Sequence, residues 1–61
     1  MTRNYPARVL VVDDELLLRW SIAETLKDHG HTVLEAENGA AALRELQSRG
    51  RLINFNPRNM L

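Results

Sequence analysis

The chain has 61 residues, eight basic and eight acidic side chains, a formal net charge of zero and no cysteine. These values give no electrostatic basis for binding nucleic acid or a membrane surface, and they exclude disulfides and thiolate metal sites. No apolar run reaches the length of a signal-peptide core or a membrane span, so we expect a cytoplasmic protein. A chain this short is one domain at most, with a core that is marginal for an isolated monomer.

The first predicted element is a strand over residues 8–12. Val9 to Val12 is apolar without alternation, which is typical of a strand buried on both faces of a parallel sheet covered by helices. So short a run could also belong to a buried helix, but its β-branched residues favour a strand. Asp13 and Asp14 follow directly, and ligands of open parallel sheets bind beyond the carboxyl ends of strands. This acidic pair is therefore the first candidate site.

A helix is predicted to begin at Glu15. Its apolar positions Leu18, Ile22 and Leu26 recur every four residues and therefore share one face. We expect Asp14 to cap the start of this helix, because a carboxylate there accepts from free backbone N–H groups. Gly30 is expected to follow its end in the left-handed conformation that favours glycine.

Leu17 and Trp20 lie off that apolar face. They are three residues apart and share a face of their own, close to Leu16. An exposed apolar patch on a small protein indicates either a partner surface or an aggregation liability. We expect Leu17 and Trp20 to contact a partner.

A second strand is predicted within residues 31–37 and a second helix over residues 40–48. Asn38 is a suitable N-cap for this helix, and Gly50 is expected to close it. The order strand, helix, strand, helix with short connections predicts right-handed crossovers in a parallel sheet. The residues expected to face inward from the second helix are Leu46 and either Ala42 or Leu43.

The composition changes after Gly50. Residues 51–61 hold one short apolar patch, three asparagines and a proline. Residues 52–55 could form a brief third strand that Pro57 would end, because proline cannot donate to a sheet ladder. We expect the rest of this tail to be flexible or ordered only by an oligomer contact. His29 and His31 flank a turn and are expected to be surface residues rather than metal ligands.

The series VLVVDDE, Arg19-Trp20, a helix ended by glycine, and LEAENGAAAL resembles the receiver domain of bacterial two-component response regulators. The Arg19-Trp20 pair is most similar to receivers attached to sigma-54-dependent activators. The resemblance covers about residues 8–50, which is under half of a complete receiver. It implies an α/β fold, namely half of a flavodoxin-like doubly wound parallel sheet whose full strand order is 2-1-3-4-5.

The resemblance also implies a chemistry. Receivers accept a phosphoryl group from a histidine kinase on an aspartate that ends the third strand. Asp13 and Asp14 match the acidic pair that helps to hold Mg²⁺, a hard cation that prefers carboxylate oxygens. An alignment without gaps places Asn56 at the phosphoacceptor position, and an amide cannot replace a carboxylate as the nucleophile. The hydroxyl residue and the lysine that follow the fourth and fifth strands have no counterpart.

We therefore interpret residues 1–50 as the N-terminal half of a receiver domain and residues 51–61 as a divergent tail. Asp13 and Asp14 are expected either to hold Mg²⁺ weakly or to act only as a solvated helix cap, and no catalytic residue is expected. The first strand is central in the family's sheet, and without a full third strand its open edge would pair with another copy.

The favoured function is a non-enzymatic, self-associating module derived from phosphorelay signalling. One alternative is an Mg²⁺-dependent phosphoacceptor that another chain completes, and the other is a fragment with no selected function.

Overall fold

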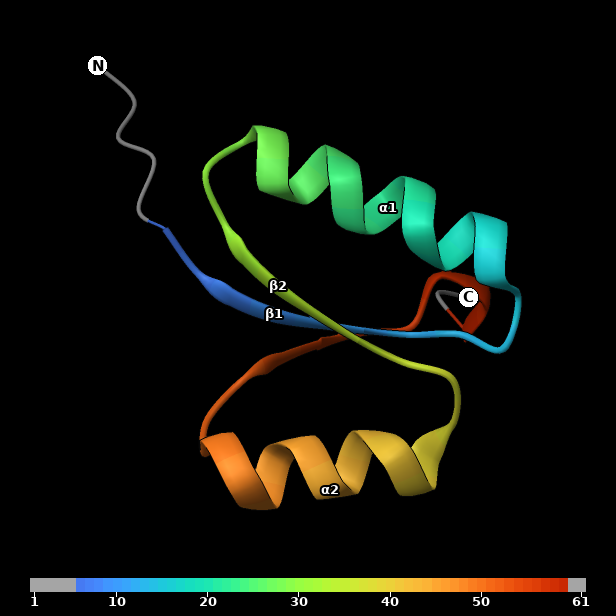
Figure 1. Cartoon of the computed structure of the whole chain (residues 1–61), viewed down its shortest axis with the longest axis vertical. Coiled ribbons are helices and arrows are strands. Elements are labelled where there is room, and N and C mark those ends of the chain that lie inside the picture. The colour runs from blue at the N-terminus through green and yellow to red at the C-terminus, as the bar shows by residue number, and fades with distance from the viewer. Residues whose placement is uncertain (1–5, 60–61) are drawn as a thin grey trace.

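The computed structural model describes residues 6–59 as a three-stranded parallel sheet with one helix on each face (Figure 1). Every element predicted from the sequence is present, so the α/β class is confirmed. The sheet has the order β2-β1-β3, with the first strand in the centre. The elements are β1 (Arg8–Val12), α1 (Leu16–Asp28), β2 (Thr32–Ala36), α2 (Gly39–Arg49), β3 (Ile53–Phe55) and a final 3₁₀ turn (Pro57–Asn59).

Strand β1 is paired along both of its edges. Its five residues align with β2 from Arg8 opposite Thr32 to Val12 opposite Ala36. Residues 9–11 also align with the three residues of β3. The expectation that the first strand would have an open edge is therefore wrong, because three residues of the tail are enough to cover its centre. Within the described residues, the unpaired edges of the sheet belong to the outer strands, β2 and β3.

The core is built around the middle of β1. Leu10 and Val11 are fully buried on opposite faces of the sheet. Leu10 packs with Ala36 and Ala42 on the side of α2. Ala42 is thus the inward-facing residue of α2, whereas Leu43 is 55% exposed and does not fill the inward role that was the alternative.

The apolar face of α1 is only half covered. Leu18, Ile22 and Leu26 are all partly exposed, and Ala23 is the buried residue of this helix. An open groove of about 310 Å³ lies between α1 and β3, and Ile22, Leu26 and Phe55 contribute to its walls. A second groove of about 390 Å³ lies on the opposite face, between α2 and β3. The sheet is therefore least covered along β3, on both faces.

The start of α1 differs from the expectation. The N-cap is Glu15, whose side chain accepts from the backbone N–H of Leu18 at 3.0 Å, and Asp14 does not cap the helix. The cause lies one residue earlier, where Asp13 Oδ1 accepts from the Glu15 N–H and folds the chain into a bend before the helix begins. Asn38 caps α2 as predicted, accepting from the Ala41 N–H at 2.8 Å.

The two glycines that follow the helices both have positive φ angles, as was expected for Gly30. Gly30 has φ of +90° and Gly50 has φ of +81°, in the region that a Cβ atom disfavours. Each glycine lets the chain reverse directly into the next strand. His31, after the first of them, is half-buried and accepts from the Ala7 N–H through Nδ1 at 3.0 Å, so its expected surface position is wrong. His29 is exposed, as predicted.

The tail folds back onto the sheet within one chain. Residues 53–55 form β3, and residues 57–59 form the 3₁₀ turn beyond it. The strand lies within the segment where a brief third strand was predicted, whereas the expectation of a flexible tail, or of one ordered only by an oligomer, does not hold for residues 57–59. This expectation cannot be judged at residues 60–61, which lie outside the described residues.

We expect Leu10→Ala to unfold this chain or to lower its free energy of unfolding by about 2–5 kcal/mol, because Leu10 is fully buried in a very small core. Leu16→Ala is the matched control, since Leu16 is 59% exposed and should change stability by less than about 0.5 kcal/mol. Urea unfolding followed by circular dichroism measures both. Equal losses for the two variants would contradict this placement of the core.

Candidate functional site

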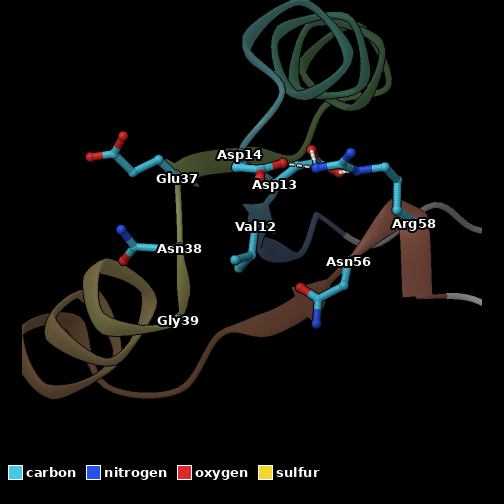
Figure 2. Close-up of a pocket in the computed structure, with 8 residues that line it drawn as sticks. All are labelled: Val12, Asp13, Asp14, Glu37, Asn38, Gly39, Asn56 and Arg58. Carbon is cyan, nitrogen blue, oxygen red and sulfur yellow. Dashed lines mark hydrogen bonds and ion pairs between the residues drawn. The ribbon is translucent and has the colours of Figure 1, made fainter.

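The carboxyl ends of the three strands lie at the same end of the sheet and surround an open cavity of about 510 Å³ (Figure 2). Its lining comes from the segments that directly follow β1, β2 and β3, which is where parallel sheets place their ligands. The lining residues are Val12, Asp13, Asp14, Glu37, Asn38, Gly39, Asn56 and Arg58.

Asp13 is the fixed point of this cavity. Its side chain is only 2% exposed, and its Oδ1 atom accepts from the Glu15 N–H at 2.8 Å. Its backbone is held as well, because the Asp13 N–H donates to the Ala36 carbonyl and the Asp13 carbonyl accepts from Arg19 Nη1 at 2.9 Å. Asp14 differs sharply, since its side chain is 76% exposed. The two adjacent carboxylates therefore have very different environments.

A guanidinium group bridges these two carboxylates. Arg58 Nε donates to Asp13 Oδ2 at 3.0 Å, and Arg58 Nη2 pairs with Asp13 Oδ1 at 2.8 Å. Arg58 Nη2 also contacts Asp14 Oδ1 (Figure 2). Two parallel contacts between one guanidinium and one carboxylate form the fork geometry that makes such pairs strong and directional. Arg58 is thus the cation of this site.

The tail brings Arg58 to the site by a short path. β3 ends at Phe55, Asn56 leaves the sheet, and Pro57 begins the 3₁₀ turn that carries Arg58. Proline fixes the backbone angle that such a turn requires and has no N–H that would need a partner. Sequence reasoning missed this residue. The sequence did contain a signal for it, namely a basic residue shortly after a possible parallel strand whose carboxyl end would lie beside Asp13.

The other predicted residues are divided between this site and the helix surface. Asn56 follows β3 directly and lines the same cavity as Asp13 and Asp14. Leu17 and Trp20 lie elsewhere, on α1, where they are 69% and 53% exposed. The exposed patch predicted there is present, and its contact with a partner stays a prediction.

Arg19 has a structural role next to the site. Its Nε atom pairs with Glu35 of β2 at 2.9 Å while Nη1 donates to the Asp13 carbonyl. Arg19 is only 15% exposed and ties α1 to the ends of β1 and β2. Its charge is therefore engaged by Glu35 rather than by the acidic pair.

The arrangement does not fit Mg²⁺ while Arg58 is bonded. Both Asp13 oxygens accept from Arg58, and Asp14 shares the same guanidinium. Glu37 extends away from the pair in Figure 2, and no group of three or more His, Cys, Asp or Glu side chains within the described residues could hold a metal ion. Mg²⁺ binding at Asp13 and Asp14 stays a prediction that requires Arg58 to move.

The charges of the cavity restrict its chemistry. Asp13, Asp14 and Glu37 contribute carboxylates against the guanidinium of Arg58, so the described lining is net acidic. An acidic lining attracts cations and repels phosphates and other anions. Within the part of the chain that the structure describes, the lining contains no serine, cysteine, histidine or lysine, and carboxylates are its groups of a nucleophilic type. The cavity is suited to holding a cation.

No protein-family model matches this chain, and neither does any curated protein or solved structure. Among the described residues, no helix is both long enough and apolar enough to cross a membrane.

We expect Asp13→Asn to lower the free energy of unfolding by about 1–3 kcal/mol, because an amide loses the charge-assisted contacts with Arg58 at a buried position. Asp14→Asn is the control at the neighbouring position, where 76% exposure limits the change to less than about 0.5 kcal/mol. Urea unfolding of both variants checks the difference. A larger loss for Asp14→Asn would contradict the roles given to the two carboxylates.

Proposed function

We propose that this chain is a receiver-like half-domain that associates with a second copy through the edge of β3 and does not transfer phosphoryl groups. The observation that carries the proposal is the exposed edge of β3. Within the described residues β3, like β2, is an edge strand that pairs only with β1. Open grooves lie beside β3 on both faces of the sheet, and its Ile53 is 58% exposed. An edge strand of this kind presents unpaired backbone groups to any strand that can align with it.

A second copy of this chain is a suitable partner for the edge of β3, because it offers a strand that can pair with that edge. Two β3 strands related by a two-fold axis can pair antiparallel, since a symmetric contact uses the same surface on both copies. The grooves beside β3, on the α1 face and on the α2 face, would then lie next to the partner's sheet. Pairing would therefore satisfy backbone groups and cover the half-exposed apolar side chains in one step.

The strand order supports the resemblance to receivers. In a flavodoxin-like sheet of order 2-1-3-4-5, the third strand lies beside the first and accepts a fourth strand on its other edge. The order β2-β1-β3 is compatible with half of that sheet. The edge that we propose for self-association is the one where the fourth strand of a complete sheet would pair.

Two features argue against phosphotransfer. The residue that follows β3 is Asn56, whose amide cannot form the acyl phosphate that an aspartate would form. In addition, the Asp13 oxygens that would hold Mg²⁺, the ion that offsets the charge of a phosphoryl group, are bonded to Arg58. A signalling module built this way acts by binding.

The exposed patch of Leu17 and Trp20 is a second candidate interface. It offers apolar area but, being on a helix, no unpaired backbone groups along its length. We favour β3 for self-association on this ground. The patch on α1 would then be available to a different partner.

Sedimentation equilibrium tests the edge directly. We expect the wild-type chain to form a dimer and Ile53→Lys to be monomeric, because a charge on an edge strand opposes pairing. Trp20→Lys is the matched control, an apolar residue of similar exposure replaced by the same charge, and it should remain dimeric. A wild-type monomer, or a dimer lost only in Trp20→Lys, would overturn edge pairing; the second result would move the interface to α1.

Incubation with acetyl phosphate and Mg²⁺ tests the absence of phosphotransfer. We expect intact-mass measurement to find no phosphoryl group added to this chain, while a complete receiver treated in parallel gains one. Addition at an aspartate of this chain would favour the alternative, an Mg²⁺-dependent phosphoacceptor completed by another copy.

A further inference from the structure

Beyond self-association, we propose that Arg58 is the resident cation of the acidic pair and that it excludes divalent cations from this site. The guanidinium of Arg58 bonds both oxygens of Asp13 and contacts Asp14, so it occupies the positions that a metal ion would need. The positive charge of Arg58 thus offsets negative charge of the acidic pair within one chain.

The environment of Asp13 makes a counter-ion necessary. A carboxylate whose side chain is only 2% exposed is unstable as an anion unless it is paired or well hydrogen-bonded. Apart from Arg58, its side chain accepts only the Glu15 N–H among the described contacts. Arg19 lies close by, but its guanidinium is committed to Glu35 and to the Asp13 backbone. Arg58 is the side chain that balances this charge.

Divalent cations and Arg58 compete for the same oxygens. Two carboxylates without a third anchor bind Mg²⁺ only loosely. Arg58 follows the end of β3 by three residues, so the chain holds its guanidinium near the pair at a high effective concentration. The apparent affinity for a divalent ion equals its intrinsic affinity multiplied by the fraction of time that Arg58 is not bonded.

The competition is reversible because the arginine remains accessible. The Arg58 side chain is 55% exposed, so its guanidinium can move into water when a metal ion takes over the charge of Asp13. Removing the guanidinium would leave Asp13, Asp14 and the amide of Asn56 around the same cavity, all of them oxygen ligands of the kind that hard cations accept. Arg58→Gln should therefore free the oxygens of Asp13 and Asp14 to bind a divalent cation.

The test compares the wild-type chain with Arg58→Gln and with Arg51→Gln as the matched control. Arg51 is exposed and belongs to the same tail. It precedes β3, so it lies at the opposite end of the strands from Asp13. Mn²⁺ binding is measured from the electron paramagnetic resonance signal of the free ion. Thermal unfolding is recorded with and without Mg²⁺ at constant ionic strength.

We expect Arg58→Gln to bind Mn²⁺ at least about tenfold more tightly than the wild-type chain, as displacement of a cation bonded most of the time requires. This variant should also unfold at a lower temperature without metal and regain stability when Mg²⁺ is added. Arg51→Gln should match the wild-type chain in both measurements.

Equal Mn²⁺ affinity in the wild-type chain and Arg58→Gln would overturn the proposal, whether both bind the ion or neither does. If Arg58→Gln fails to fold, Arg58→Lys replaces it, since lysine keeps the charge but loses the fork geometry. Tighter Mn²⁺ binding by Arg58→Lys than by the wild-type chain supports exclusion, and unchanged binding overturns it. The Mn²⁺ affinities can be compared whether or not the chain forms dimers. Thermal unfolding is compared at one protein concentration, because the unfolding temperature of a dimer depends on it.

Discussion

The double burial of β1 is the constraint on which the rest of this structure depends. Leu10 faces α2 and Val11 faces the opposite side, and neither retains any exposed area. The strand is also paired on both edges, over five residues with β2 and over three with β3. Among the described elements, no other segment provides this much apolar burial, and a chain of 61 residues has little else from which to build a core. The helices, the neighbouring strands and the site are all positioned relative to it.

The central position of β1 also determines where the ion pair between Asp13 and Arg58 forms. Because β1 is central, the residue that follows it emerges between the ends of β2 and β3, and the side chain of Asp13 is buried there. A buried carboxylate requires a cation, and the tail provides one in Arg58. The pairing of β3 with β1 and the bonding of Arg58 to Asp13 therefore reinforce each other, since both hold the tail against the central strand.

The shortness of β3 explains where this fold is incomplete. A strand of three residues covers the centre of β1 but provides little surface on which a helix can pack. Ile22 and Leu26 on one face, and Leu43 on the other, remain partly or largely exposed beside it. Apolar side chains and backbone groups left open along one edge are the physical basis for proposing that a second copy completes the sheet.

The sequence by itself determined the elements and their order, because periodicity, caps and glycines act over a few residues. The run Val9 to Val12, the Asn38 cap and the positive φ angles of Gly30 and Gly50 are all local signals of this kind. It also placed Asp13 and Asp14 at the carboxyl end of β1, and the resemblance to receivers placed Asn56 at the phosphoacceptor position after the third strand. Only the tertiary structure decided that Glu15 rather than Asp14 caps α1 and that the tail covers β1. It alone paired Arg58 with the acidic pair, because that contact joins residues 45 positions apart and depends on β3 lying beside β1.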